Sequence, residues 1–162
     1  MINIYINLKK GGVYMLNKIK KHAATCVFCK LLILFLIGGF TYVGIELCYR
    51  GYSHWTMFLL GGLCFVCVGG INNYIDYDMP IVLQSVIASI IITILEYICG
   101  YIVNIKLGLN VWDYSQLPFN LNGQICLLFS LIWMGIGMIA IFIDDYIRYK
   151  LFDEPVPKYK WK

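Results

Sequence analysis

The sequence predicts an all-α integral membrane protein, a four-helix bundle with both termini cytoplasmic. Sixty per cent of the 162 residues are apolar or aromatic, only 14% are charged, and the mean hydropathy is +0.74. A soluble domain of this length carries about a quarter charged residues. Four apolar stretches each approach the roughly 20 residues that a helix needs to cross a bilayer. They leave no room for a soluble catalytic domain in the same chain.

The first residues are expected to stand apart from the membrane domain. Residues 9–12, Lys-Lys-Gly-Gly, back-translate to a purine-rich tract shortly before the codon of Met15, as a translated ribosome-binding site would. We therefore expect residues 1–14 to be a misassigned start or a disordered leader, and residues 15–152 to form the membrane domain. The apolar run that follows the basic residues from Lys18 is too long for a cleavable signal peptide, and it lacks a small-x-small cleavage site.

The first two helices are predicted over residues 26–49 and 54–71. Lys30 lies near the start of the first and can extend toward the interface. Gly51 favours a left-handed stop, and Ser53 is a typical N-cap for the second helix. Because the connection is so short, the two helices must form an antiparallel hairpin. The second helix carries two glycine pairs that let another helix approach closely: Gly61-Gly62 and Gly69-Gly70.

The third helix is predicted over residues 80–104, after a polar loop at residues 72–78. Pro80 suits the first turn of a helix, where its missing N–H would have no partner. Glu96 lies well inside the apolar run. An ionised carboxylate there costs roughly 2.5–3.5 kcal/mol on insertion scales, so Glu96 needs a partner or water.

The fourth helix is predicted over residues 123–145, with Asn122 or Gly123 at its start and an amphipathic continuation to Phe152. The tail, residues 153–162, is too often interrupted by proline to stay helical. Three charged residues near the end of the fourth helix are predicted to form an interfacial cluster where it leaves the membrane: Asp144, Asp145 and Arg148.

The basic residues predict the orientation of the chain. Four spans place both termini and the second loop on one side, which then holds eleven of the thirteen Lys and Arg residues. Only Arg50 and Lys106 lie on the other side. The positive-inside rule makes the first side cytoplasmic. The net charge of +4 is thus explained without nucleic acid as a partner, and a multi-pass protein of the bacterial plasma membrane is expected.

A polar cluster is predicted at the extracellular end, around the interruption between the third and fourth helices. Glu46 and Arg50 are one helical turn apart and can pair. The planar guanidinium of Arg50 can also hold a second carboxylate, either Glu96 or Asp113. The predicted ligand-binding or structural cluster comprises Glu46, Arg50, His54, Glu96, Asn104, Trp112, Asp113, Tyr114, Asn120 and Gln124.

Two interpretations of this cluster stay open. It is either a vestibule that binds a polar or charged solute or relays protons, or a buried ion-pair network that fixes helix packing. Trp112 and Tyr114 also fit an interfacial aromatic belt. Metal binding by His54 is disfavoured, because one histidine makes a poor transition-metal site. No metal and no cofactor are expected, and no serine or cysteine nucleophile is placed persuasively beside His54.

The seven cysteines are scattered through apolar runs and imply no disulfide framework. Two C-x-x-C matches, Cys26–Cys29 and Cys64–Cys67, lack a zinc-ribbon or βαβ context. They are interpreted as small apolar residues on helices. One disulfide stays open among the cysteines expected in the outer half: Cys48, Cys99 and Cys126.

The sequence also resembles a known family. The resemblance is carried by the stretch Arg50-Gly51-Tyr52-Ser53-His54-Trp55, by the loop LGLNVWDYSQLPFNLNGQIC and by the tail DDYIRYKLFDEPVPKY. From about Leu31 to the C-terminus the chain is similar to the small bacterial membrane proteins labelled putative ABC-transporter permeases. Because the chain has no G-x-x-x-x-G-K-[ST] phosphate loop, any ATPase would be a separate nucleotide-binding subunit.

Together these observations predict a transport permease or a transport accessory subunit with a polar site at the extracellular face. Four helices are few for a solute pathway, so homo-oligomerisation or partner subunits are expected, within a shell of membrane lipid. The alternative is a non-transporting scaffold or sensor whose outer loop binds a partner or a lipid headgroup. A membrane enzyme ranks behind both.

Overall fold

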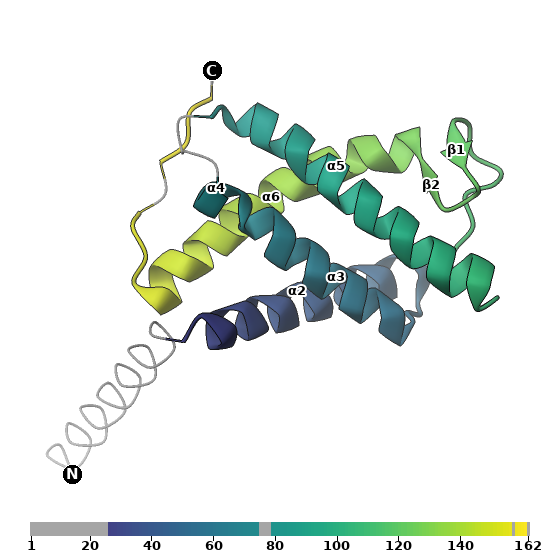
Figure 1. Cartoon of the computed structure of the whole chain (residues 1–162), viewed down its shortest axis with the longest axis horizontal. Helices are drawn as coiled ribbons and strands as arrows, with labels where there is room; N and C mark the ends of the chain where they lie inside the picture. The colour runs from purple at the N-terminus through teal and green to yellow at the C-terminus, as the bar shows by residue number, and fades with distance from the viewer. Residues whose placement is uncertain (1–25, 75–78, 157, 162) are drawn as a thin grey trace, which may run out of the picture.

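A computed structural model describes residues 26–74, 79–156 and 158–161 of the chain. It confirms an all-α membrane bundle, because four helices in this part of the chain are long and apolar enough to cross a membrane (Figure 1). The predicted leader, residues 1–14, lies outside the described residues. The helices of the bundle are α2 (Val27–Arg50), α3 (Trp55–Gly69) with the single turn α4 (Ile71–Tyr74), α5 (Ile81–Gly100) and α6 (Leu127–Phe152).

Helices α2 and α3 form the predicted antiparallel hairpin. The turn between them contains Gly51, whose φ of 76° is left-handed. A Cβ atom on Gly38 would overlap the side chain of Phe65, and one on Gly61 would overlap Tyr42. The two helices therefore approach as closely as they do because these positions carry no side chain.

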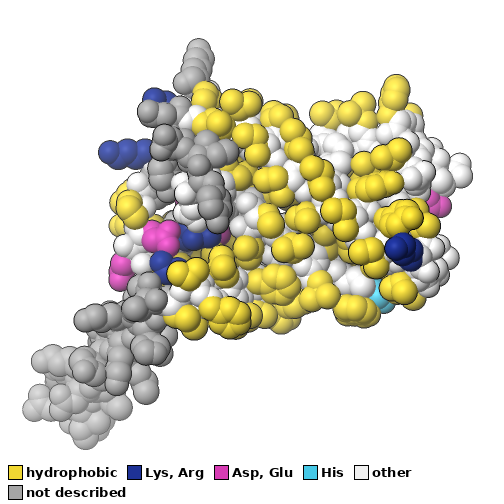
Figure 2. Space-filling model, viewed as in Figure 1, with side chains coloured by type: hydrophobic (Ala, Val, Ile, Leu, Met, Phe, Trp, Pro, Cys, Tyr) yellow, Lys and Arg dark blue, Asp and Glu magenta, His cyan; other side chains and the backbone are white. Residues whose placement is uncertain are grey.

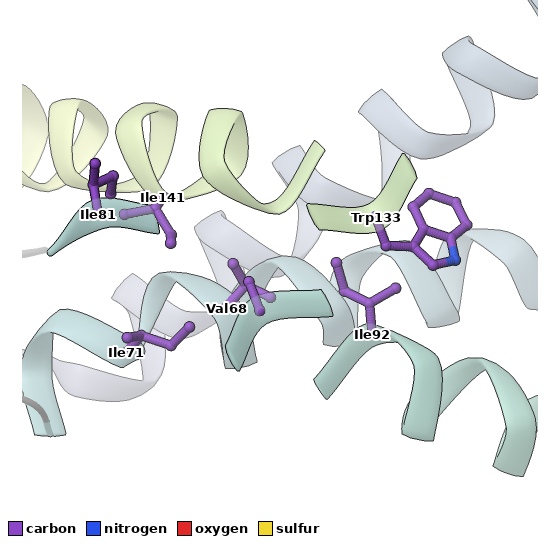
Figure 3. Packing of buried hydrophobic residues seen from close by; sticks show 7 residues of the cluster. Val68, Ile71, Ile81, Ile92, Trp133 and Ile141 are labelled. Atoms are coloured by element: carbon purple, nitrogen blue, oxygen red, sulfur yellow. The ribbon is translucent and has the colours of Figure 1, made fainter. Parts of the chain in front are cut away.

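Helices α5 and α6 form the second pair, and α3 contacts both of them. Gly137 of α6 faces Ala88 of α5. The Ser89 hydroxyl donates a hydrogen bond to the Ser130 carbonyl at 2.5 Å. Figure 3 shows side chains of the apolar core that α3, α4, α5 and α6 share. Its buried members are Val68, Ile71, Ile81, Ala88, Ile92, Trp133 and Ile141.

Large apolar side chains cover the outside of the bundle. Phe40, Leu131 and Ile139 each leave more than half of their surface exposed. Figure 2 shows apolar side chains across the visible face, with the charged ones gathered toward its two ends. An apolar belt between polar ends is the surface that a bundle spanning a bilayer requires.

The connection between α5 and α6 forms structure of its own. It contains the π-helix η1 (Tyr101–Lys106) and the short strands β1 (Asn120–Leu121) and β2 (Ile125–Cys126). The two strands pair as an antiparallel hairpin. The prediction that α6 begins at Asn122 or Gly123 is wrong. Both residues have a positive φ, 53° and 68°, and occupy the hairpin turn, so the helix begins only at Leu127.

The two ends of the described chain lie at the end of the bundle opposite the hairpin (Figure 1). Lys30, near the start of α2, forms an ion pair with Glu154, just after α6, at 2.8 Å from Nζ to Oε1. The carbonyl of Lys160 in the tail accepts a hydrogen bond from the N–H of Ile81 at the start of α5. We call this end of the bundle the terminal end and the hairpin end the loop end.

Candidate functional site

Glu46 and Arg50 pair at the loop end of α2, as the sequence predicts. Arg50 Nη2 donates a hydrogen bond to Glu46 Oε1 at 2.8 Å. The Ser53 hydroxyl donates to the other carboxylate oxygen at 2.5 Å. Arg50 Nη1 donates to the backbone carbonyl of Val111 at 2.9 Å. The ion pair thereby fastens the α2–α3 turn to the loop that precedes α6.

Asn104, in the π-helix η1, fastens the same loop from the other side. Its Oδ1 accepts a hydrogen bond from the N–H of Val111 at 2.7 Å. Its Nδ2 donates to the Trp112 carbonyl at 3.0 Å and to Gln124 Oε1 at 2.8 Å. A Cβ on Gly100 would come within 2.6 Å of that Gln124 oxygen and 2.9 Å of Trp112 Cζ2, so a larger residue there would displace side chains of the network. Five predicted site residues belong to this network, which Val111 joins: Glu46, Arg50, Asn104, Trp112 and Gln124.

Glu96 is buried beside this network, with 3% of its surface exposed. The Tyr114 hydroxyl donates to Glu96 Oε1 at 3.1 Å, and the Trp133 indole N–H donates to Oε2 at 2.8 Å. Burial raises the pKa of Tyr114, and the nearby Glu96 carboxylate raises it further, so the hydroxyl stays protonated and remains a donor. Trp133 is a site residue that the sequence analysis missed, because an apolar helical stretch gives no sign of a distant carboxylate.

The prediction that Arg50 holds a second carboxylate is wrong. Glu96 is bound by Tyr114 and Trp133. Asp113 instead accepts hydrogen bonds from its own loop. The guanidinium of Arg50 reaches a backbone carbonyl in place of either carboxylate because the loop folds over the ends of the helices.

Three predicted site residues support the backbone rather than the network. His54 caps the first turn of α3, in place of the predicted Ser53. Both carboxylate oxygens of Asp113 accept hydrogen bonds from Ser115, at 2.8 Å from its N–H and 3.0 Å from its hydroxyl. Asn120 bonds backbone groups across the hairpin loop. These residues shape the loop end without contacting Glu96.

A cavity of about 130 Å³ adjoins Glu96. Residues of α2, α3, α5 and α6 all line it, and most of them are apolar. Thr41, Tyr42 and Trp133 are among the residues that line it, and Glu96 is the only carboxylate in the described lining. The loop-end network therefore lies above an apolar space with one acidic group at its boundary.

A second polar cluster lies at the terminal end. As predicted, Asp144, Asp145 and Arg148 form a charge cluster at the end of α6, but they are buried, with 0%, 4% and 7% of their surface exposed. Arg148 Nε donates to Asp144. Asp145 Oδ2 accepts from Asn72 Nδ2 at 2.6 Å and from the Tyr159 hydroxyl at 2.8 Å. Burial comes from contacts with the distant α4 and the tail, which leave no local signal in the sequence.

The described residues contain no group of three or more His, Cys, Asp or Glu side chains placed to hold a metal ion. All seven cysteines are free thiols, including Cys48, Cys99 and Cys126, among which one disulfide was left open.

Comparison with known proteins identifies a family. Residues 32–160 match the model of a protein family described as "Putative ABC-transporter type IV". The match extends from the first turns of α2 through the loop to the tail. No curated protein and no solved structure matches the chain.

Proposed function

Because the chain belongs to this ABC-transporter-type family, we propose that it is a permease, or an accessory subunit of one, with a polar site at the extracellular face. Membership and four spanning helices make it a multi-pass membrane protein related to transport. One observation supports the proposal of a polar solute site in particular. A buried carboxylate, Glu96, borders a cavity lined by all four helices, beneath a loop held by a hydrogen-bonded network.

The distribution of basic residues supports placing the loop end outside the cell. Eleven of the thirteen Lys and Arg residues precede Leu31 or follow Asp145, in the two terminal parts of the chain. Arg50 and Lys106 are the two at the loop end. The positive-inside rule then assigns the terminal end to the cytoplasm of a bacterial cell.

Arg50 is the proposed anchor for an acceptor group of the solute. Its two terminal nitrogens are engaged by Glu46 and Val111, while its Nε is buried without a hydrogen-bond partner. A guanidinium has five N–H donors in one plane, and these two hydrogen bonds use two of them, so a carboxylate or similar group can meet those that remain. Arg50 can therefore bind an acceptor group of the solute while its ion pair with Glu46 stays intact.

Tyr114 is the proposed connection between the loop and the cavity. Its hydroxyl bonds Glu96, while its backbone N–H donates to the Gly123 carbonyl in the hairpin at 2.7 Å. Its ring stacks on Phe129 of α6, with the ring centroids 4.6 Å apart. A solute that engages Glu96 from the cavity competes with this hydroxyl, so its binding would be coupled to the position of the loop.

Energy for transport would come from a partner. The chain has no phosphate-binding loop motif, so ATP hydrolysis requires a separate nucleotide-binding subunit. The terminal end is the proposed contact surface for it, because the tail packs there against the start of α5. A homo-oligomer would supply the further helices that a solute pathway needs.

A scaffold or sensor whose loop binds a partner or lipid headgroup is the second candidate. The observation in its favour is Phe119, which is 82% exposed and has a φ of 54°. Leu107 and Leu121 are also more than half exposed at the loop end. Apolar side chains presented on a loop are typical of a contact surface.

Purification from native membranes tests the proposal. A tagged chain in mild detergent is expected to bring with it a nucleotide-binding subunit that hydrolyses ATP. Glu96→Gln is expected to keep that subunit but to lower hydrolysis about tenfold, which is within the coupling typical of linked sites.

The control is Gln116→Glu, the reverse amide-to-acid change at an exposed residue of the loop, which should leave hydrolysis unchanged. Recovery of the folded chain without any nucleotide-binding subunit contradicts the permease assignment. If Glu96→Gln unfolds the chain instead, Glu96 has a structural role and the scaffold gains support.

A further inference from the structure

The cavity beside Glu96 reaches the lipid-facing surface between α2 and α6. Its inner wall contains buried residues of α3, α5 and α6, among them Val68, Ile92 and Trp133 (Figure 3). Its lining also includes Ile45 of α2 and Ile139 of α6, which are exposed on the outside of the bundle. Helix α2 packs mainly against α3. A solute can therefore enter from the hydrocarbon of the membrane without first crossing the polar loop.

The shape of the cavity suits one hydrocarbon chain. Along α6 its lining extends from Trp133 to Ile143, which is about 15 Å at the rise of an α-helix. Its volume of about 130 Å³ is close to the roughly 150 Å³ of an apolar cavity that holds a single benzene ring. An apolar space of this kind accepts apolar groups, whereas a hydrophilic solute would lose its hydration there without gaining new partners.

One negative charge lies at the loop end of this cavity. Glu96 is the only charged residue in the described lining. Its hydrogen bonds come from the neutral donors Tyr114 and Trp133, and it takes part in none of the ion pairs among the described residues. Arg50 lies outside the lining and pairs with Glu46. An ionised carboxylate has about four lone-pair sites, so Glu96 can accept a further donor.

Aromatic rings lie beside this charge. Tyr42 of α2 and Trp133 of α6 both line the cavity, and their ring centroids are 6.2 Å apart. The indole N–H of Trp133 also bonds Glu96, so the rings and the carboxylate belong to one end of the cavity. An ammonium ion is attracted to the faces of tyrosine and tryptophan rings as well as to a carboxylate. An anionic solute would be repelled by Glu96, so the lining favours a cation.

We propose, on the basis that this cavity is the solute site of the proposed permease, that the solute is a single-chain amphiphile with a protonated amine. Its ammonium group donates to Glu96 beside the rings of Tyr42 and Trp133, and its hydrocarbon chain extends along α6 toward Ile143. An alkylamine is protonated at neutral pH, as the lysine side chain is. Any acceptor on the same head group would be left for Arg50.

Photolabelling of the purified full chain in dodecyl maltoside tests the proposal. The probe is dodecylamine with a diazirine in its chain, and the detergent itself supplies a neutral dodecyl chain in large excess. Mass spectrometry is expected to locate the label in residues 38–45 of α2 and 136–143 of α6, which line the cavity. Unlabelled dodecylamine should displace the probe at a concentration about tenfold or more below that of dodecanol, because only the amine is charged. Dodecanoate should be weaker still.

Two variants and a matched control separate the charge from the space. Glu96→Gln keeps the shape of the side chain and removes its charge, so the preference for dodecylamine over dodecanol should fall about tenfold. Cys64→Leu adds bulk to the wall of the cavity, and Cys67→Leu makes the same change at an exposed position of α3. Labelling of residues 38–45 should fall in the first cysteine variant and stay unchanged in the second.

Label spread evenly over the lipid-facing surface, or equal displacement by dodecylamine and dodecanol, would overturn the proposal. An unaltered preference in a folded Glu96→Gln variant would do the same. If Glu96→Gln does not fold, the comparison of amine, alcohol and carboxylate on the wild-type chain decides. Amine binding by a chain that recovers no nucleotide-binding subunit would contradict the permease and keep the amine site. A chain that recovers the subunit but binds no amine would keep the permease and exclude this class of solute.

Discussion

Glu96 is held in the bundle by two donors, one from the loop and one from α6. Replacing Trp133 with Phe keeps most of the ring packing but removes the N–H that bonds Glu96 Oε2. The free energy of unfolding is expected to fall by about 1–3 kcal/mol, because a buried carboxylate oxygen loses its partner. Titration with a denaturing detergent, followed by circular dichroism, measures the change.

Trp55→Phe is the control, because Trp55 is 65% exposed. Its effect should stay within about 0.5 kcal/mol. An equal loss of stability in the two variants would attribute the effect to the smaller ring and not to the bond with Glu96.

Residue partners were predictable only where they are close in sequence. The Glu46–Arg50 pair follows from their spacing on one helix. Glu96 was correctly expected to need partners, but Trp133 lies 37 positions along the chain from it. His54 took the capping role predicted for Ser53, because the serine hydroxyl is engaged by Glu46. Sequence spacing predicts a contact within one helix, such as Glu46 with Arg50. Contacts between distant segments, such as Glu96 with Trp133, depend on tertiary packing.

At the scale of elements, the α2–α3 hairpin depends on glycine. Gly61→Ala is expected to lower the free energy of unfolding by about 1–3 kcal/mol, because its new Cβ overlaps Tyr42. Gly44→Ala puts the same methyl group where no atom lies within 4 Å, and alanine favours the helix. Detergent-induced unfolding of the two variants should therefore move in opposite directions, or leave Gly44→Ala unchanged. A similar loss of stability in both variants would mean that the overlap with Tyr42 is not its cause.

The helices themselves were predictable from the length of the apolar runs, and the loop between α5 and α6 was not. Asn122 and Gly123 are as typical of a helix start as of a hairpin turn, and local sequence does not separate the two. The hairpin prevails because Trp112 and Asn104 bond Gln124 and fix the residues before α6 in an extended conformation. The π-helix η1 likewise has no sequence signal, although it contains Asn104.

At the scale of the whole molecule, an even number of crossings brings the start of α2 and the end of α6 to the same end of the bundle. That arrangement was expected from four apolar runs, and the Lys30–Glu154 ion pair is consistent with it. The burial of the terminal-end cluster was not predicted, because the tail returns over α6, where the Tyr159 ring packs on Phe142 with centroids 4.7 Å apart. From sequence alone, charged residues at the end of an apolar helix are expected to be exposed. Their burial here depends on the tail, which packs over them.

The orientation of the bundle decides which polar cluster meets the outside of the cell, and labelling can measure it. In a chain without its native cysteines, Gln116→Cys places one thiol on the exposed loop, and Lys158→Cys places one on the exposed tail. A membrane-impermeant maleimide should modify the first in intact cells and the second only after permeabilisation, because the basic terminal end stays inside. The reverse pattern would put Arg50 and its network in the cytoplasm and remove the proposed extracellular site. Labelling of both in intact cells would contradict the four-crossing topology itself.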